Sequence, residues 1–173
     1  MKDRTDLMKV GSSMENHLKE TAEKTLKYLC VGAVIEGLNF YGLKLILSGA
    51  ESNFKRIDGQ IYINLESKFE IFKSFPLQIP LEHELPNLDW KESAKKVCEL
   101  RLKKITDIRL TDTVPHLFIT FETGEVLFIS GHNDKYESWQ VGVWGNSNKE
   151  EIWEVVCCPG DGIAIWAPDD IAG

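Results

Sequence analysis

The residues that could form a metal site or a catalytic pair are few in this sequence and poorly spaced. His116, His132, Cys157 and Cys158 are types that bind zinc, but zinc sites use pairs of ligands a short distance apart on local turns. Adjacent cysteines on a strand point to opposite faces, so Cys157 and Cys158 cannot chelate one ion together. A thiol nucleophile needs a histidine base, and no local signature supplies one. The sequence also lacks a nucleophile elbow, a phosphate loop and a dinucleotide fingerprint. We therefore expect no metal, no cofactor and no enzymatic activity.

Carboxylate groups are the stronger chemical feature, because they gather in the last third of the chain. The formal net charge is −7, and residues 111–173 contain 2 lysines against 11 acidic residues. An acidic surface repels nucleic acid and anionic lipid, and it attracts basic proteins by long-range steering. The same charge also serves solubility. We predict a partner-binding surface formed by some of these acids, with one tryptophan as an anchor: Glu122, Glu125, Asp134, Glu137, Trp144, Glu150, Glu151 and Glu154.

Four of the five tryptophans also lie in this last part of the chain. Trp139 alternates in phase with Val141 and Val143, which predicts a core position. Trp144 and Trp153 fall on the other face of their strands or near a turn, and they are the better candidates for contact with a partner. Large rings can equally fill the core of a small domain. A pocket among the tryptophans, with polar groups such as His132 or Gln140, stays open as an alternative.

We expect the elements that position these residues to form one domain over 1–173, with a flexible start at 1–12. An apolar stripe of Leu18, Ala22, Leu26 and Leu29 predicts a helix near 14–30. Strand patterns follow at 34–40, 43–48, 60–65 and 69–72. Together these form a helix-plus-β half over 13–72.

Residues 73–89 contain three prolines and predict an extended connection, with Phe75, Leu77, Ile79 and Leu81 available for packing. Asp89 then caps a short helix at about 90–101. The rest of the second half, 90–173, shows strand patterns at 105–110, 116–121, 126–130, 136–144, 152–158 and 163–166. The sequence thus predicts an α+β fold, mainly an antiparallel β-sheet in meander order, with an N-terminal helix and a second short helix.

The two halves share a weak internal echo. Ile35-x-x-Leu38-x-Phe40 matches Ile105-x-x-Ile108-x-Leu110, and each follows a predicted helix. The run 45–49 similarly matches 127–131. A duplicated helix-plus-β unit would explain the echo, and so would the general likeness of strands.

The expected location is the cytoplasm. The charged start of the chain is not a secretory signal, and no run of apolar residues is long enough to cross a membrane. Four cysteines without an export signal predict free thiols.

A hairpin ending at Ser130-Gly131 is followed by Tyr136-Glu137-Ser138-Trp139-Gln140 and by a strand that leads to Pro159-Gly160-Asp161-Gly162. Over about residues 100–170 this general pattern resembles small bacterial immunity proteins of polymorphic or contact-dependent toxin systems. The resemblance implies a cytoplasmic inhibitor that binds and blocks one cognate toxin domain, often a basic nuclease.

The acidic block agrees with that implication, since it would complement a nucleic-acid-binding cleft. We therefore expect an acidic inhibitor whose partner is a basic protein, with no direct contact to nucleic acid or membrane. The alternatives are a small-molecule-binding module or enzyme with a pocket in the Trp-rich sheet, and a structural subunit that self-associates through a strand edge.

Overall fold

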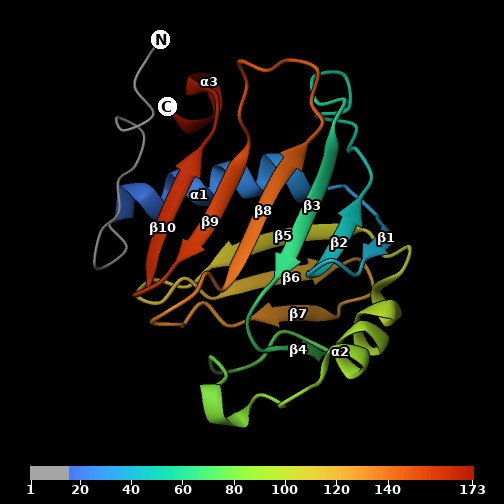
Figure 1. Cartoon of the computed structure of the whole chain (residues 1–173), viewed down its shortest axis with the longest axis vertical. Helices are drawn as coiled ribbons and strands as arrows, with labels where there is room; N and C mark the ends of the chain where they lie inside the picture. The colour runs from blue at the N-terminus through green and yellow to red at the C-terminus, as the bar shows by residue number, and fades with distance from the viewer. Residues whose placement is uncertain (1–15) are drawn as a thin grey trace.

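A computed structural model describes residues 16–173 and shows two antiparallel sheets packed against each other, with a long helix at one side and a short one at the other (Figure 1). The predicted flexible segment 1–12 lies outside the described residues. The helices are α1 (Asn16–Cys30), α2 (Trp90–Val97) and α3 (Asp169–Ala172), with 3-10 turns η2 (Glu82–Glu84) and η3 (Cys98–Leu100). The strands are β1 (Ile35–Asn39), β2 (Leu43–Leu47), β3 (Gln60–Leu65), β4 (Phe69–Phe72), β5 (Ile105–Leu110), β6 (Leu117–Phe121), β7 (Val126–Ile129), β8 (Trp139–Trp144), β9 (Glu154–Cys158) and β10 (Gly162–Trp166).

The larger sheet has the order β1-β2-β3-β8-β9-β10, and the smaller has the order β4-β7-β6-β5. The predicted α+β class, with mainly antiparallel strands, an N-terminal helix and a short second helix, is confirmed. The strands of the second half form two meanders, one in each sheet: β5-β6-β7 in the smaller and β8-β9-β10 in the larger. No helix in the described part of the chain is long and apolar enough to cross a lipid bilayer.

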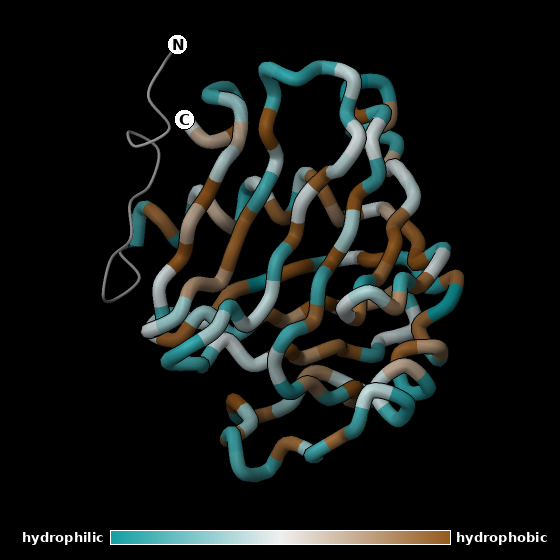
Figure 2. Tube along the Cα trace, in the orientation of Figure 1, coloured by the Kyte–Doolittle hydropathy of each residue, from teal (hydrophilic) through white to brown (hydrophobic). Residues whose placement is uncertain are grey.

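The core lies between the two sheets and under α1. Alternate residues of each strand face inward, as in Trp139 and Val141 of β8, which are fully buried. α1 adds Ala22, Leu26 and Leu29 to the same core. Figure 2 shows this alternation as hydrophobic and hydrophilic bands along the strands. Removal of these apolar side chains from water is the main force that holds the layers together.

The end of α1 is tied to the loop after β2 by one buried amide. Asn53 Nδ2 donates to the carbonyl oxygens of Tyr28 at 2.7 Å and Leu29 at 3.2 Å. Asn53 Oδ1 accepts from Ala50 N at 2.9 Å. Carbonyls in the last turn of a helix have no partner within the helix, so this side chain satisfies groups that would otherwise be buried without one.

Residues 16–72 and 90–144 repeat one order of elements: a helix, an irregular strand, two more strands and a fourth strand that enters the other sheet. Where the helices end, the two segments exchange reciprocal hydrogen bonds. Gly32 N donates to Ile105 O at 2.8 Å, and Leu102 N donates to Ile35 O at 2.8 Å. Gly32 and Leu102, which occupy equivalent positions, both have positive φ, at 89° and 63°. The two segments are therefore related by an approximate two-fold rotation.

The same reciprocity appears where the chain passes from one sheet to the other. Glu66, after β3, donates its N–H to Ser138 O at 3.0 Å, and Ser130, after β7, donates its N–H to Lys68 O at 2.9 Å. Beyond these crossings β4 pairs with β7, and β8 pairs with β3. Each segment thus gives its fourth strand to the sheet of the other.

The predicted echo is correct for the first strands and wrong for the second run. Residues 35–39 and 105–110 are the equivalent strands β1 and β5. Residues 45–49, however, contain β2, the second strand of its segment, whereas residues 127–131 contain β7, the third. Alternating apolar residues look alike in any half-buried strand, so the pattern alone could not identify the equivalent pair.

The connection 73–89 crosses the outer face of the smaller sheet, where Leu85 packs with Phe118 and Phe128. The prediction that its alternate apolar side chains also pack is correct for Phe75, whose ring centroid lies 4.7 Å from that of Phe118, and wrong for Leu77, Ile79 and Leu81. Prolines hold the segment extended without a sheet partner. Leu85 is the one apolar side chain of the connection that is buried. The others are exposed by 46%, 104%, 50% and 55%: Phe75, Leu77, Ile79 and Leu81.

Replacing Asn53 with alanine should lower the free energy of unfolding by about 2–3 kcal/mol, because it leaves buried backbone groups without their hydrogen-bond partner. Urea unfolding followed by circular dichroism measures the loss. Ser52→Ala, one residue away and exposed, is the control and should leave the midpoint unchanged. Equal midpoints for the two variants would contradict this role of Asn53.

Candidate functional site

The outer face of the larger sheet carries the most distinctive group of polar and aromatic side chains. Figure 1 looks onto this face, and no helix of residues 16–173 runs across its strands. Strand register places the outward residues side by side: Gly142 of β8 lies between Tyr62 of β3 and Glu154 of β9. Gln140 lies in the same way beside Asn64 of β3.

Gly142 gives Tyr62 room to lie across β8. A Cβ atom at this glycine would stand 3.0 Å from the Tyr62 hydroxyl and 3.0 Å from Trp153 O. Trp144, two residues further along β8, contacts the Tyr62 ring edge to face, with 5.1 Å between centroids and 82° between planes. The aromatic side chains are therefore fixed on the face rather than extended into solvent.

Two carboxylates stand beside this aromatic pair. Gln140 Nε2 donates to Glu137 Oε2 at 2.6 Å, which holds Glu137 over the start of β8. Burial first, and then the charge of Glu137, raise the pKa of Glu154. Burial and the same two carboxylates raise the pKa of Tyr62. Neither Glu137 nor Glu154 forms an ion pair with a lysine or arginine within the described residues. We call Tyr62, Glu137, Gln140, Trp144 and Glu154 the acidic face.

The structure brings together only three of the eight predicted contact residues, namely Glu137, Trp144 and Glu154. Glu122 and Glu125 lie at the β6–β7 turn of the smaller sheet. Glu125 pairs with Lys103, which lowers its pKa. Glu122 Oε1 accepts from Lys104 N at 3.4 Å. An ion pair with Lys103 thus holds the Glu125 side chain, and the backbone N–H of Lys104 holds the Glu122 side chain.

The remaining candidates occupy loops at the two ends of β8. Asp134 is exposed before β8, and Glu150 is exposed between β8 and β9. Glu151 pairs with Arg56 at 2.7 Å, and the same guanidinium holds Asp170 at 2.8 Å. Hydrogen bonding to Arg56 lowers the pKa of Glu151 and of Asp170. Part of the acidic block is thus neutralised within the molecule.

The tryptophan predictions were partly right. Trp139 is in the core, as expected, and its Nε1 donates to Pro115 O at 2.9 Å. Trp153 was predicted to be available for contact, but it is 2% exposed. Its ring stacks on Tyr28 at 5.2 Å and lies 5.1 Å from the Arg56 guanidinium. Trp153, just before β9, points into the core because α1 packs against that side of the sheet.

Sequence reasoning missed Tyr62, which belongs to the first half of the chain. Its one local signal is the alternation of Tyr62 with the buried Ile61 and Ile63, which predicts that its side chain faces outward. Nothing local could place it beside β8, because that neighbour is 80 positions away in the register Tyr62–Gly142.

Among the described residues, no hydrogen bond joins a cysteine thiol to a histidine ring. All four cysteines are free, and burial raises the pKa of Cys30 and of Cys157 to about 12, so both stay protonated near neutral pH. His132 Nδ1 lies 2.8 Å from Asp161 Oδ1, and this contact raises the pKa of His132. Over residues 16–173 no three His, Cys, Asp or Glu side chains gather around a point that could hold a metal ion.

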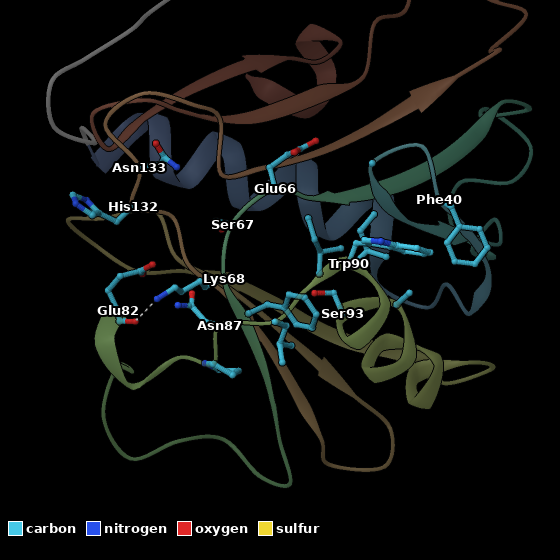
Figure 3. A pocket seen from close by; sticks show the side chains of 17 residues that line it. Phe40, Glu66, Ser67, Lys68, Glu82, Asn87, Trp90, Ser93, His132 and Asn133 are labelled. Atoms are coloured by element: carbon cyan, nitrogen blue, oxygen red, sulfur yellow. Dashed lines mark hydrogen bonds between the residues drawn. The ribbon is translucent and has the colours of Figure 1, made fainter.

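A cleft of about 610 Å³ shares no residue with the acidic face and lies between the β1–β2 turn, the start of α2 and the crossings between the sheets (Figure 3). Its tryptophan is Trp90, and none of the four tryptophans of the last part of the chain lines it. The pocket predicted among those four tryptophans therefore does not correspond to this cleft.

Glu154→Gln should stabilise the protein near neutral pH by less than about 1 kcal/mol, the size of a repulsive cross-strand charge pair. The folded-state pKa of Glu154 is raised, so its ionisation costs stability as the pH rises through that pKa. The gain from the substitution should therefore vanish as the pH falls below the ordinary range of a glutamate. Thermal unfolding of both proteins across pH 3–8 tests this, and a gain that does not change with pH would contradict it.

A scan against protein-family models gives no match for this chain, and neither do searches among curated proteins and solved structures. What the protein does must therefore be argued from its own residues.

Proposed function

We propose that the protein binds a basic partner protein through the acidic face and inhibits it. The observation that carries this proposal is the pair Glu137 and Glu154, two carboxylates that repel each other beside the aromatic rings of Tyr62 and Trp144. A lysine or arginine from a partner would relieve the repulsion and lie against aromatic rings at the same time.

A protein is the better ligand for this face than nucleic acid or a membrane surface. Phosphate groups would add to the repulsion between the carboxylates. A sheet face bearing fixed rings and few mobile side chains loses little conformational entropy on contact, which suits association with another folded surface. Tyrosine and tryptophan are also the residues that most often contribute binding energy at protein interfaces.

The role of inhibitor rests on the resemblance to immunity proteins. The segment Tyr136–Gln140, on which that resemblance partly depends, supplies Glu137 and Gln140 to the acidic face. A toxin nuclease needs a basic surface to bind its substrate, so an acidic face that covers this surface would both attract the toxin and block it.

The double substitution Glu137→Gln with Glu154→Gln should slow association with the partner about tenfold or more at low salt, because steering charges act mainly on the association rate. The matched control is Glu122→Gln with Glu150→Gln, which changes the net charge equally at two other exposed candidates. The partner is captured from the native host, identified and purified, and the binding rates of the three proteins are measured by surface plasmon resonance.

Three results would overturn the proposal. The captured protein could be acidic or neutral, its association rate could be independent of salt, or the control could lose as much affinity as the double variant. Inhibition has its own readout, since expression of the partner alone should arrest growth and co-expression of this protein should restore it.

The exposed side chains of the connection 73–89 favour a second function, self-association. Leu77 and Ile79 lie on the protein surface with exposed fractions of 104% and 50%, and exposed large apolar side chains are available for burial in an interface. Two copies could bury these side chains against each other.

Sedimentation equilibrium of the wild type and of Leu77→Ser with Ile79→Ser tests this second function. A dimer that dissociates in the double variant would support it. The matched control is Tyr41→Ser, because Tyr41 is 91% exposed elsewhere on the surface. A wild type that is monomeric at high concentration would exclude it.

A further inference from the structure

The cleft beside α2 has two chemically different ends. Phe40, from the β1–β2 turn, and Trp90, at the start of α2, stand at one end of its mouth (Figure 3). Lys68, Glu82 and His132 stand at the other end. Between them the lining contains apolar side chains from both sheets, among them Leu65 and Phe69.

The two aromatic side chains are far more exposed than rings of this size usually are. Phe40 is 70% exposed and Trp90 is 69% exposed. Exposed apolar surface of this size at the edge of a hollow marks a place where a ligand binds. Lys91 Nζ lies 5.7 Å from the Trp90 ring centroid, and the exposed faces that the two rings keep at the cleft mouth suit a ligand with a flat apolar face of its own.

The charges of the cleft disfavour an anionic ligand. Glu66 and Glu82 line it together with one lysine, Lys68, whose Nζ donates to Glu82 O at 3.5 Å. The start of α2 is no anion site either, because its own residues already cap it. Asp89 Oδ1 accepts from Glu92 N at 2.8 Å, and Glu92 Oε2 accepts from Asp89 N at 2.8 Å. A phosphate or carboxylate in the cleft would meet Glu66 and Glu82.

The remaining polar groups are neutral or balanced, and they offer donors and acceptors in similar number. Asn87 and Asn133 supply amides, and Ser93 supplies a hydroxyl. Asn133 Oδ1 already accepts from the N–H groups of Lys135 and Tyr136, both at 2.9 Å, so Asn133 offers its Nδ2 donors, whereas Asn87 and Ser93 can donate and accept. Beside them Glu66 accepts and Lys68 donates. A ligand that matches this lining carries several groups that are donors and acceptors at once.

A polyhydroxylated ring satisfies all of these conditions. Its hydroxyl groups both donate and accept, it has no charge, and its C–H face is flat and apolar. We propose that the cleft between Phe40, Trp90 and the sheet crossings binds a neutral saccharide, with a sugar ring against the aromatic side chains and its hydroxyl groups toward Glu66, Asn87 and Lys68. The cleft volume of about 610 Å³ lies within the range of small-molecule sites, about 300–1,000 Å³.

This site is formed by other residues than the acidic face, and Asn64 lies between the two, since it pairs with Gln140 and donates to Glu66 Oε1 at 2.6 Å. The two share no residue, so either can fail without the other. The double variant Glu137→Gln with Glu154→Gln should therefore keep full saccharide binding, and loss of the protein partner would leave this proposal intact.

The test uses the whole chain labelled with ¹⁵N and follows its tryptophan indole N–H signals by NMR. Trp90→Phe assigns the signal of Trp90. The probes are neutral mono- and disaccharides of gluco, galacto, manno and N-acetylhexosamine configuration, with adenosine as an uncharged flat ring and glucose 6-phosphate as an anionic sugar. We expect a saturable shift of the Trp90 signal with at least one neutral saccharide, and at least a tenfold weaker response to glucose 6-phosphate.

Phe40→Ala and Trp90→Ala should each abolish saturable binding, measured by calorimetry because Trp90→Ala has no indole signal at that position. Both side chains are exposed, so neither substitution should unfold the protein, and thermal unfolding checks this. Trp144→Ala removes another exposed tryptophan and should bind as the wild type does. No saturable shift with any saccharide, tighter binding of adenosine, or binding that survives both alanine substitutions would overturn the proposal.

Discussion

The structure depends on a reciprocal exchange of strands between its two sheets. Each segment of one helix and four strands completes its own sheet with a strand from the other, so β8 pairs with β3 and β4 pairs with β7. The backbone hydrogen bonds at the crossings, from Glu66 to Ser138 and from Ser130 to Lys68, hold both exchanges in register. Because strand edges left open in either segment would expose unpaired backbone groups, the two segments must fold together.

Both candidate sites are consequences of this exchange. The β3–β8 pair that it creates brings Tyr62 of the first segment beside Gly142 and within electrostatic reach of Glu154. The second site is the cleft, which lies between α2 and the point where the chain leaves β3 at Glu66. The approximate two-fold relation ends beyond β8, where the second segment continues into β9, β10 and α3. These elements pack against α1 and have no counterpart in the first segment.

Charge in this molecule is distributed by tertiary contacts rather than by position in the sequence. Arg56 neutralises Glu151 and Asp170, and Lys103 neutralises Glu125. Glu137 and Glu154 form no ion pair with a basic residue of the described part of the chain, and the charge of Glu137 raises the pKa of Glu154 after burial does. An acidic stretch of sequence is therefore a poor guide to an acidic surface, because side chains of both signs from distant segments compete for the same space.

The sequence by itself determined the class of the fold and nearly every element within it. Period-two alternation identified the strands, and the stripe of Ala22, Leu26 and Leu29 identified the long helix, because these patterns arise from local backbone geometry. The capping pair at Asp89 and the inward direction of Trp139 were readable for the same reason. Only the tertiary structure decided which strands lie side by side, that Trp153 turns inward, and that Leu77, Ile79 and Leu81 stay exposed. Strand pairing joins residues as far apart as Gln60 and Trp144, and the sequence records the face of each strand but not the neighbour that it will meet.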